Sequence, residues 1–291
     1  MSELELRQTT VVSAAEHEAA RPARRMPRIG TLLAFAFVAF LAVAAFAPGL
    51  VQTHPPNAIS AAEAFQAPSF AHWFGTDESG RDVYSRVVAG TGTSLLIGVT
   101  ATFIGLLLGA VLGALASFGG RAVDFGVSRL VEVLFAFPGL LLALLVIVIA
   151  GPGPVTATIA VGLSTAPGYA RIIRGQLVAI RSAPFVESAR VLGHAPGRIL
   201  ARHILPNALV PLLVLATLGI GQAIVWASAL SYLGLGAQPP AAEWGAMLAA
   251  GRTYLGTAWW MTVFPGLMIV GTTVATTVLG RALTRRDQEV R

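Results

Sequence analysis

The feature that most constrains the fold of this chain is a series of apolar runs separated by short segments rich in arginine. Several runs reach the roughly 20 residues that a helix needs to cross the hydrocarbon core of a bilayer. Irregular backbone cannot face lipid, because its polar groups would lack hydrogen-bond partners there. We therefore predict an all-α, polytopic membrane protein with six transmembrane helices.

The six runs cover residues 29–47, 92–118, about 125–150, 155–173, 208–230 and 261–279. Residues 1–28 are polar and show no apolar periodicity, so we expect a disordered cytoplasmic tail followed by a transmembrane domain over 29–291. The first run also resembles a signal peptide ending at Ala45-Phe46-Ala47. Because Pro48 would impede cleavage there, we predict an uncleaved span.

The arginines predict the orientation of the spans. All 20 basic residues in the Lys+Arg total are Arg, and with the amino terminus inside only Arg81, Arg86 and Arg252 fall on the outer side. Cytoplasmic loops have the excess of positive charge in membrane proteins. We therefore expect both termini, and the basic loop between the fourth and fifth spans, to be cytoplasmic.

Two residue types are absent, and both absences exclude functions. Without Cys the chain has no disulfide, no thiol nucleophile and no cysteine metal site. Without Lys it has no P-loop lysine to contact nucleotide phosphates, so we expect a non-catalytic chain that binds no cofactor. The pI of about 10.9 is typical of nucleic-acid binding, but the arginines lie in loops between apolar spans, and we expect no nucleic-acid partner.

The segment 184–211 is polar and basic although it lies between two apolar runs. Helical spacing predicts a short helix over 185–192, with Phe185, Ala189 and Leu192 on one face.

Glycine and proline punctuate the rest of this segment. Gly193 is suited to the left-handed conformation that ends a helix, and Pro196 to the first turn of a second helix. We expect that helix to run into Leu205-Pro206, where the chain turns into the membrane again. The pattern fits two interpretations equally, a rigid elbow that transmits force or an ordinary basic loop.

A family resemblance favours the elbow. Glu187-Ser188-Ala189, then Gly193, then Ile204-Leu205-Pro206 resemble the E-A-A…G…I-x-L-P loop of binding-protein-dependent ABC importer permeases. The string ending at Asn207 is similar to the dipeptide, oligopeptide and nickel branch of that family. Two departures are Ser188 for the first Ala and the Ile that stands directly before Leu-Pro.

The resemblance implies a type I ABC importer permease, the C-type subunit of a peptide importer, in a bacterial inner membrane. Residues 181–206 would be the cytoplasmic coupling loop that docks on an ATPase. The docking residues that it implies are Glu187, Ser188, Ala189, Val191, Leu192, Gly193, His194 and Pro196. The implied partners are a second, homologous permease, two cytoplasmic ATPases that hold ATP and Mg²⁺, and an extracytoplasmic substrate-binding protein.

The outer segments 48–90 and 236–258 are the only outer loops large enough to dock that binding protein. The strings Gly75-Thr76-Asp77…Gly80-Arg81-Asp82 and Glu243-Trp244 are similar to segments of peptide-importer permeases. The candidate docking residues are Phe70, Asp77, Arg81, Glu243 and Trp244.

The same outer string predicts local structure. Thr76 or Asp77 would cap a helix over 83–89 that lies on the membrane surface. The carboxylates also suggest a metal site, but Arg81 stands among them without ligand spacing, and we predict none.

Two patterns lie inside the spans. Gly105, Gly109 and Gly113 recur every four residues, which predicts a face for close helix packing. Arg129 and Glu132 are charges one helical turn apart, and either pair structurally or serve a substrate or proton path. Pro138 predicts a kink in the third span.

Function follows from these patterns and the resemblance together. We expect a permease subunit of an ABC importer for di- or oligopeptides, with nickel, glutathione or another small solute as the alternative cargo. A secondary transporter would need intramembrane carboxylates near mid-bilayer, where only Glu132 is a candidate. A membrane-embedded enzyme lacks a catalytic constellation.

Overall fold

A computed structural model describes residues 29–290, with side chains to residue 284; the tail predicted over 1–28 lies outside the described residues. The described part is helical, and its only strand-like feature is an isolated bridge between Thr76 and Asp82. The longer helices are α2 (Ile29–Phe46), α3 (Val83–Phe118), α4 (Gly120–Phe135), α5 (Gly139–Ala150), α6 (Pro154–Arg181), α9 (Leu205–Tyr232) and α11 (Trp260–Val290). The shorter elements are η1 (Pro48–Leu50), η2 (Ala61–Glu63), α7 (Pro184–Val191), α8 (Pro196–Ile199), the π-helical η3 (Leu200–Ile204), α10 (Trp244–Gly251) and η4 (Arg252–Tyr254).

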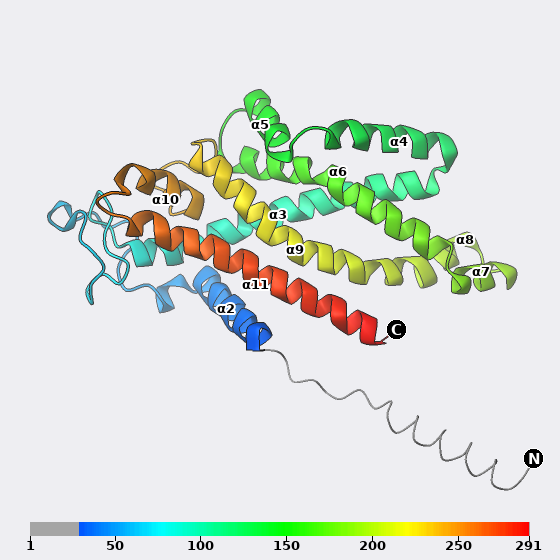
Figure 1. The fold of residues 1–291 in the computed structure, drawn as a ribbon, viewed down its shortest axis with the longest axis horizontal. Coiled ribbons are helices and arrows are strands. Elements are labelled where there is room, and N and C mark those ends of the chain that lie inside the picture. The colour runs from blue at the N-terminus through cyan, green and yellow to red at the C-terminus, as the bar shows by residue number, and fades with distance from the viewer. Residues whose placement is uncertain (1–28, 291) are drawn as a thin grey trace, which may run out of the picture.

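The molecule is elongated, and its two ends are different. Helices α3, α6, α9 and α11 run along the long axis (Figure 1). The short helices α7 and α8 lie at one end, and α10 lies with the loop that precedes α3 at the other (Figure 1). We call residues 181–206 the elbow, and residues 48–90 with 236–258 the outer lobe.

Length and hydropathy do not confirm the six predicted spans. Four helical segments are long and apolar enough to cross a membrane: Ile29–Phe46, Val83–Phe118, Pro196–Tyr232 and Trp260–Thr284. Helices α4 and α5 form a fifth if the bent pair counts as one span, but they meet at 91°. The kink predicted at Pro138 is therefore a complete break, because Pro138 has an extended ψ of 128° and starts a new helix.

Helix α6 is long enough to span a bilayer but is not among the segments that meet the hydropathy criterion. It packs against α3 through the predicted glycine face. A Cβ added to Gly109 would come within 2.5 Å of the Tyr169 Cβ, and one added to Gly113 would lie 3.1 Å from the Ala170 carbonyl oxygen. The prediction of close packing along this face is confirmed.

The surface helix predicted over 83–89 is wrong. These residues are the first two turns of α3, which continues without interruption to Phe118. Val83, Val87 and Val88 are buried, so this turn belongs to the protein core rather than to the membrane surface. The cap is also displaced from the predicted Thr76 or Asp77, because the Asp82 carboxylate accepts the Ser85 N–H at 2.8 Å.

Candidate functional site

The elbow contains the glycine turn expected from the sequence. Gly193 has φ of +78°, and the His194 N–H donates to the Ala189 carbonyl at 3.1 Å while the Gly193 N–H donates to Arg190 at 2.9 Å. This pair of bonds is the Schellman motif, which satisfies the last carbonyls of α7. Pro196 then starts α8, as predicted.

The short helix expected over 185–192 is present as α7, and Val186 and Ala189 form its buried face. Val186 and Ala189 are buried against a cluster that includes Ile199 and Ile204, whereas Phe185 and Leu192 are exposed. Positions 186 and 189 are three residues apart, so they share a face that packs on the neighbouring helices. Ala189 therefore anchors the elbow.

The remaining predicted docking residues form an exposed tip. Val191 and Leu192 are 84% and 74% exposed, next to Gly193 and Pro196, which are also exposed. Glu187 and Ser188 are exposed on the same short helix, and half-buried His194 stacks on His203 with ring centroids 6.1 Å apart. The tip thus presents aliphatic side chains to its surroundings, although water is unfavourable for them.

The Glu187 carboxylate lies in the first turn of α7 but makes no capping hydrogen bond. Within the part of the chain that the structure describes, it forms no ion pair either. A single carboxylate on this basic loop could cap its own helix or pair with an arginine of an ATPase, and the first of these two roles is not observed. A favourable interaction with the positive end of the α7 dipole is retained by its position alone.

The elbow passes directly into a long helix. No break in the helix occurs at the expected turn, Leu205-Pro206: α8, η3 and α9 follow one another directly, and Pro196–Tyr232 is one 37-residue helical segment, long and apolar enough to cross a membrane. Pro206 has no N–H to donate, and it lies directly after the π-helical η3, where the regular hydrogen-bond pattern of the helix is already interrupted. No loop therefore separates the elbow from α9.

The outer lobe is built around buried charges. Asp77 accepts the backbone N–H groups of Ser79 and Arg81 at 2.9 and 3.0 Å, and its other oxygen lies 2.6 Å from the Arg81 Nε. Arg81 also donates to Glu78 at 2.9 Å, and the Arg86 Nε lies 3.5 Å from Asp77. These pairs satisfy charges that would be costly to bury alone.

A second set of contacts attaches α10 to the lobe. The Glu243 carboxylate caps α10 by accepting the N–H groups of Gly245 and Ala246 at 2.8 and 2.9 Å. The Trp244 indole N–H donates to the Val87 carbonyl at 3.0 Å, across the start of α3. The lobe is thus held together by residues far apart in sequence.

Four of the five predicted binding-protein contacts are therefore not on the surface. Asp77, Arg81, Glu243 and Trp244 are buried within this chain, so they hold the lobe together and do not form an exposed docking surface. These residues resemble segments of related permeases because they have a structural role. Sequence similarity alone does not distinguish such a role from contact with a partner. Phe70 is fully exposed and stays the one surface candidate of that set.

Two ion pairs involve α4, and sequence spacing predicted only the longer and more exposed of them. Arg129 and Glu132 approach at 3.5 Å, and both side chains are more than half exposed. Arg174 of α6 instead donates two hydrogen bonds, of 2.6 and 2.7 Å, to the carboxylate of Asp124 in α4. This bidentate pair joins residues 50 positions apart, so no periodicity in the sequence indicated it.

Comparison with protein families gives one domain match. Residues 87–287 match the model of the binding-protein-dependent transport system inner membrane component. The match covers most of the chain and begins within the first turns of α3, so most of the outer loop that precedes α3 lies outside it.

Three individual relatives are named as permeases of dipeptide or glutathione transport systems. The chain is 40% identical over 249 residues to the dipeptide transport system permease protein DppC of Alkalihalophilus pseudofirmus, covering 84% of this chain and 80% of that protein. It is 40% identical over 243 residues to the probable D,D-dipeptide transport system permease protein DdpC of Escherichia coli, covering 84% and 81%. It is 41% identical over 218 residues to the glutathione transport system permease protein GsiD of Pectobacterium atrosepticum, covering 75% and 72%.

Solved structures agree on the fold at lower identity. An inward-facing MetNI methionine ABC transporter chain is 21% identical, with a TM-score of 0.53 over 68% of this chain and 96% of that one. An amino acid ABC transporter chain crystallised with histidines is 18% identical, with a TM-score of 0.56 over 69% and 94%.

Proposed function

This chain belongs to the inner membrane component family of binding-protein-dependent transport systems, in its dipeptide and oligopeptide branch, and on that premise we propose that it forms a translocation path for di- or oligopeptides with a second permease. It is a multi-pass membrane subunit of an ABC importer. In the proposed assembly two cytoplasmic ATPases hold ATP and Mg²⁺ and dock at the elbow. A substrate-binding protein delivers cargo to the outer lobe.

The observation that supports ATPase coupling is the contrast between the two sides of α7. Val186 and Ala189 fix the helix on the bundle, while Val191 and Leu192 project from its end. Anchors on one side and unpaired aliphatic side chains on the other are what a docking element requires. The unbroken helix from Pro196 to Tyr232 supplies a stiff connection from that tip into the membrane.

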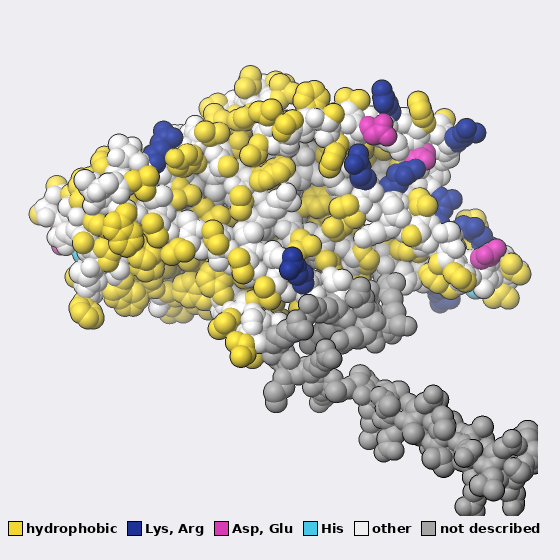
Figure 2. Space-filling model, in the orientation of Figure 1, with side chains coloured by type: hydrophobic (Ala, Val, Ile, Leu, Met, Phe, Trp, Pro, Cys, Tyr) yellow, Lys and Arg dark blue, Asp and Glu magenta, His cyan; other side chains and the backbone are white. Residues whose placement is uncertain are grey.

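The arrangement of charges supports a cytoplasmic elbow. Arginine side chains gather over α4, the end of α6 and the elbow, and few appear near the outer lobe (Figure 2). Arg81 and Arg86, which belong to the lobe, are neutralised by the acidic side chains around them. A membrane placed between these two ends, with the elbow inside, satisfies the positive-inside tendency and puts both termini in the cytoplasm.

Peptide cargo is proposed from the dipeptide permeases among the relatives, and glutathione is itself a small peptide. Nickel or another small solute is the alternative cargo. Reconstituted vesicles containing this chain, its sister permease, the ATPases and the binding protein distinguish these cargos. We expect ATP-dependent uptake of a labelled dipeptide; uptake of nickel alone would identify the other cargo class.

The energy source is tested in the same vesicles. Uptake is expected with ATP inside the compartment equivalent to the cytoplasm, and not with a proton gradient alone. The chain on its own is expected to hydrolyse no ATP, because it lacks a phosphate-binding lysine. Gradient-driven uptake without ATP would show instead that the chain belongs to a secondary transporter.

A further inference from the structure

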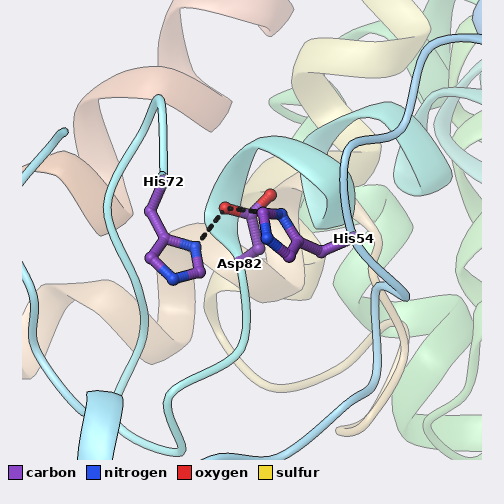
Figure 3. A group of neighbouring side chains, drawn as sticks. All are labelled: His54, His72 and Asp82. Atoms are coloured by element: carbon purple, nitrogen blue, oxygen red, sulfur yellow. Dashed lines mark hydrogen bonds and ion pairs between the residues drawn. The ribbon is translucent and has the colours of Figure 1, made fainter. Parts of the chain in front are cut away.

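Three polar side chains from three separate segments meet in the outer lobe. His54 follows η1, His72 lies in the loop after η2, and Asp82 caps α3. The His72 Nδ1 lies 2.9 Å and the His54 Nδ1 3.9 Å from the same Asp82 Oδ1. The two imidazole rings are neighbours, with centroids 4.8 Å apart, and the Nδ1 atom of each lies near this carboxylate (Figure 3).

We propose that His54, His72 and Asp82 form a binding site for a late first-row divalent cation, with Zn²⁺ as the best-matched ion. One ligand atom from each residue lies within 4.8 Å of the other two. Tetrahedral Zn²⁺ with ligands about 2.0–2.2 Å away separates the ligand atoms by roughly 3.3–3.5 Å. The two nitrogen–oxygen distances of 2.9 and 3.9 Å lie on either side of that separation, so small side-chain rotations complete the site.

The donor set selects the class of ion. Two imidazole nitrogens and one carboxylate oxygen suit zinc and other late transition ions, whereas Mg²⁺ and Ca²⁺ prefer oxygen ligands alone. The chain has no Cys, so no thiolate competes for such an ion. Three protein ligands leave one tetrahedral position for water, on the side of His54, whose side chain is 40% exposed.

The surroundings hold the ligands in place. The Asp82 Oδ2 accepts the Ser85 N–H at 2.8 Å, which leaves Oδ1 facing the two rings. The Ser85 hydroxyl accepts the His54 N–H at 3.0 Å, which ties the His54 backbone to α3. The His54 Nδ1 also lies 3.0 Å from the Thr53 hydroxyl, a contact that metal binding would exchange or that leaves Nε2 as the ligand. Outer contacts of this kind orient metal ligands.

Neighbouring positive charges do not oppose the cation. Arg81, the residue before Asp82, directs its guanidinium to Asp77 and Glu78 at 2.6 and 2.9 Å. Arg86, one turn into α3, donates to Asn57 at 3.1 Å and approaches Asp77. The Asp82 carboxylate is thus free of an arginine partner among the described residues.

The site lies outside the segment that matches the family model, which begins at residue 87. Its ligands are 18 and 10 positions apart in the sequence, which matches no short metal motif, and the site appears only once the loop folds over α3. The sequence-based expectation of no metal site considered the acidic string 77–82 alone. A bound ion would tie three segments of the outer lobe to the start of α3, whatever cargo the importer carries.

Zinc binding by the purified full-length chain tests this proposal. The chain is prepared with an affinity tag free of histidine, stripped with chelator and titrated with ZnCl₂ against a zinc-responsive dye. We expect one equivalent to bind, and Co²⁺ in its place to show the visible absorption of a tetrahedral site. His54→Ala, His72→Ala and Asp82→Asn should each weaken binding by about 10–100-fold or more.

Controls separate loss of ligands from loss of fold. Asp82→Asn keeps an oxygen that accepts the Ser85 N–H, so α3 stays capped, and half-buried His54 can be truncated without opening the core. His194→Ala with His203→Ala removes two imidazoles from the elbow and should leave binding unchanged. The proposal is overturned if the wild type binds no zinc, if the His54→Ala/His72→Ala double variant binds like the wild type, or if only the elbow variant loses binding. No transport partner or substrate is present, so the outcome is independent of the proposed function.

Discussion

The elbow and the outer lobe lie at opposite ends of the molecule and are stabilised in different ways (Figure 1). The elbow is built from local signals: a short helix, a glycine in the left-handed region and a proline at the next helix start. The outer lobe depends on contacts across the sequence, such as the Trp260 indole N–H donating to the Thr76 carbonyl at 3.0 Å.

The difference shows how each end presents a surface. At the elbow the residues that resemble the family motif are mostly exposed, and the anchors lie between them. In the lobe the residues that resemble relatives are buried, and the exposed surface consists of residues such as Phe70 that no motif marked. Residues that match a family motif can therefore form an exposed surface, as in the short helix of the elbow. They can also form the buried framework of a folded loop, as in the outer lobe.

The largest effect on stability is expected from a substitution that breaks the buried charge network of the lobe. Arg81→Met leaves Asp77 and Glu78 with less compensation and should destabilise the chain by up to about 3–5 kcal/mol, the cost of breaking a buried ion pair. The measurement is the thermal unfolding of the purified chain in detergent. Arg190→Met, at an exposed elbow position, is the matched control and should change stability by less than about 0.5 kcal/mol. Equal shifts for both variants would contradict the contrast between the two ends.

The next effect is on coupling. Gly193 has φ of +78° and open space around its missing side chain, so Gly193→Val imposes only backbone strain, roughly 1–2 kcal/mol. We expect normal membrane insertion and pairing with the sister permease, with ATPase co-purification and substrate uptake reduced roughly 5–30-fold.

Gly197→Val is the control for this change. Gly197 also faces open space but lacks a positive φ, so the same side chain is accepted there without left-handed strain. Normal uptake by Gly193→Val, or equal loss in both variants, would show that the left-handed turn does not determine coupling.

Two glutamates, one in each region, allow a comparison in which the expected change in stability is smaller. Glu243→Ala removes the cap of α10 and should cost about 0.5–2 kcal/mol of stability. Glu187→Ala removes an exposed carboxylate with no partner among the described residues, so stability should stay within about 0.5 kcal/mol. If Glu187 pairs with an arginine on the ATPase, its variant should instead lose ATPase co-purification. Unchanged co-purification would assign Glu187 no role in docking.

The substitutions with the smallest expected effect test only on which side of the membrane the lobe and the elbow lie. Phe70→Cys and Ala241→Cys are exposed substitutions in the lobe and should react with an impermeant thiol reagent in intact cells. Val191→Cys, at the elbow tip, should react only after the membrane is opened. The absence of natural Cys removes background labelling. The reverse pattern would invert the proposed orientation.

The sequence by itself determined the helical membrane class, the existence of the elbow and its glycine turn. These features depend on composition, apolar run length and the conformational freedom of a single residue, so no distant contact can change them much. The spacing of Gly105, Gly109 and Gly113 also predicted a packing face, although not its partner α6.

Only the tertiary structure decided the rest. Helix α6 falls short of the hydropathy criterion because its small and polar residues, such as Gly162 and Thr165, face protein rather than lipid. The break between α4 and α5, the buried state of Asp77 and Glu243, and the meeting of His54 with His72 each depend on segments far apart in sequence. Local periodicity contains no information on such contacts, since they arise from how long helices and one outer loop pack together.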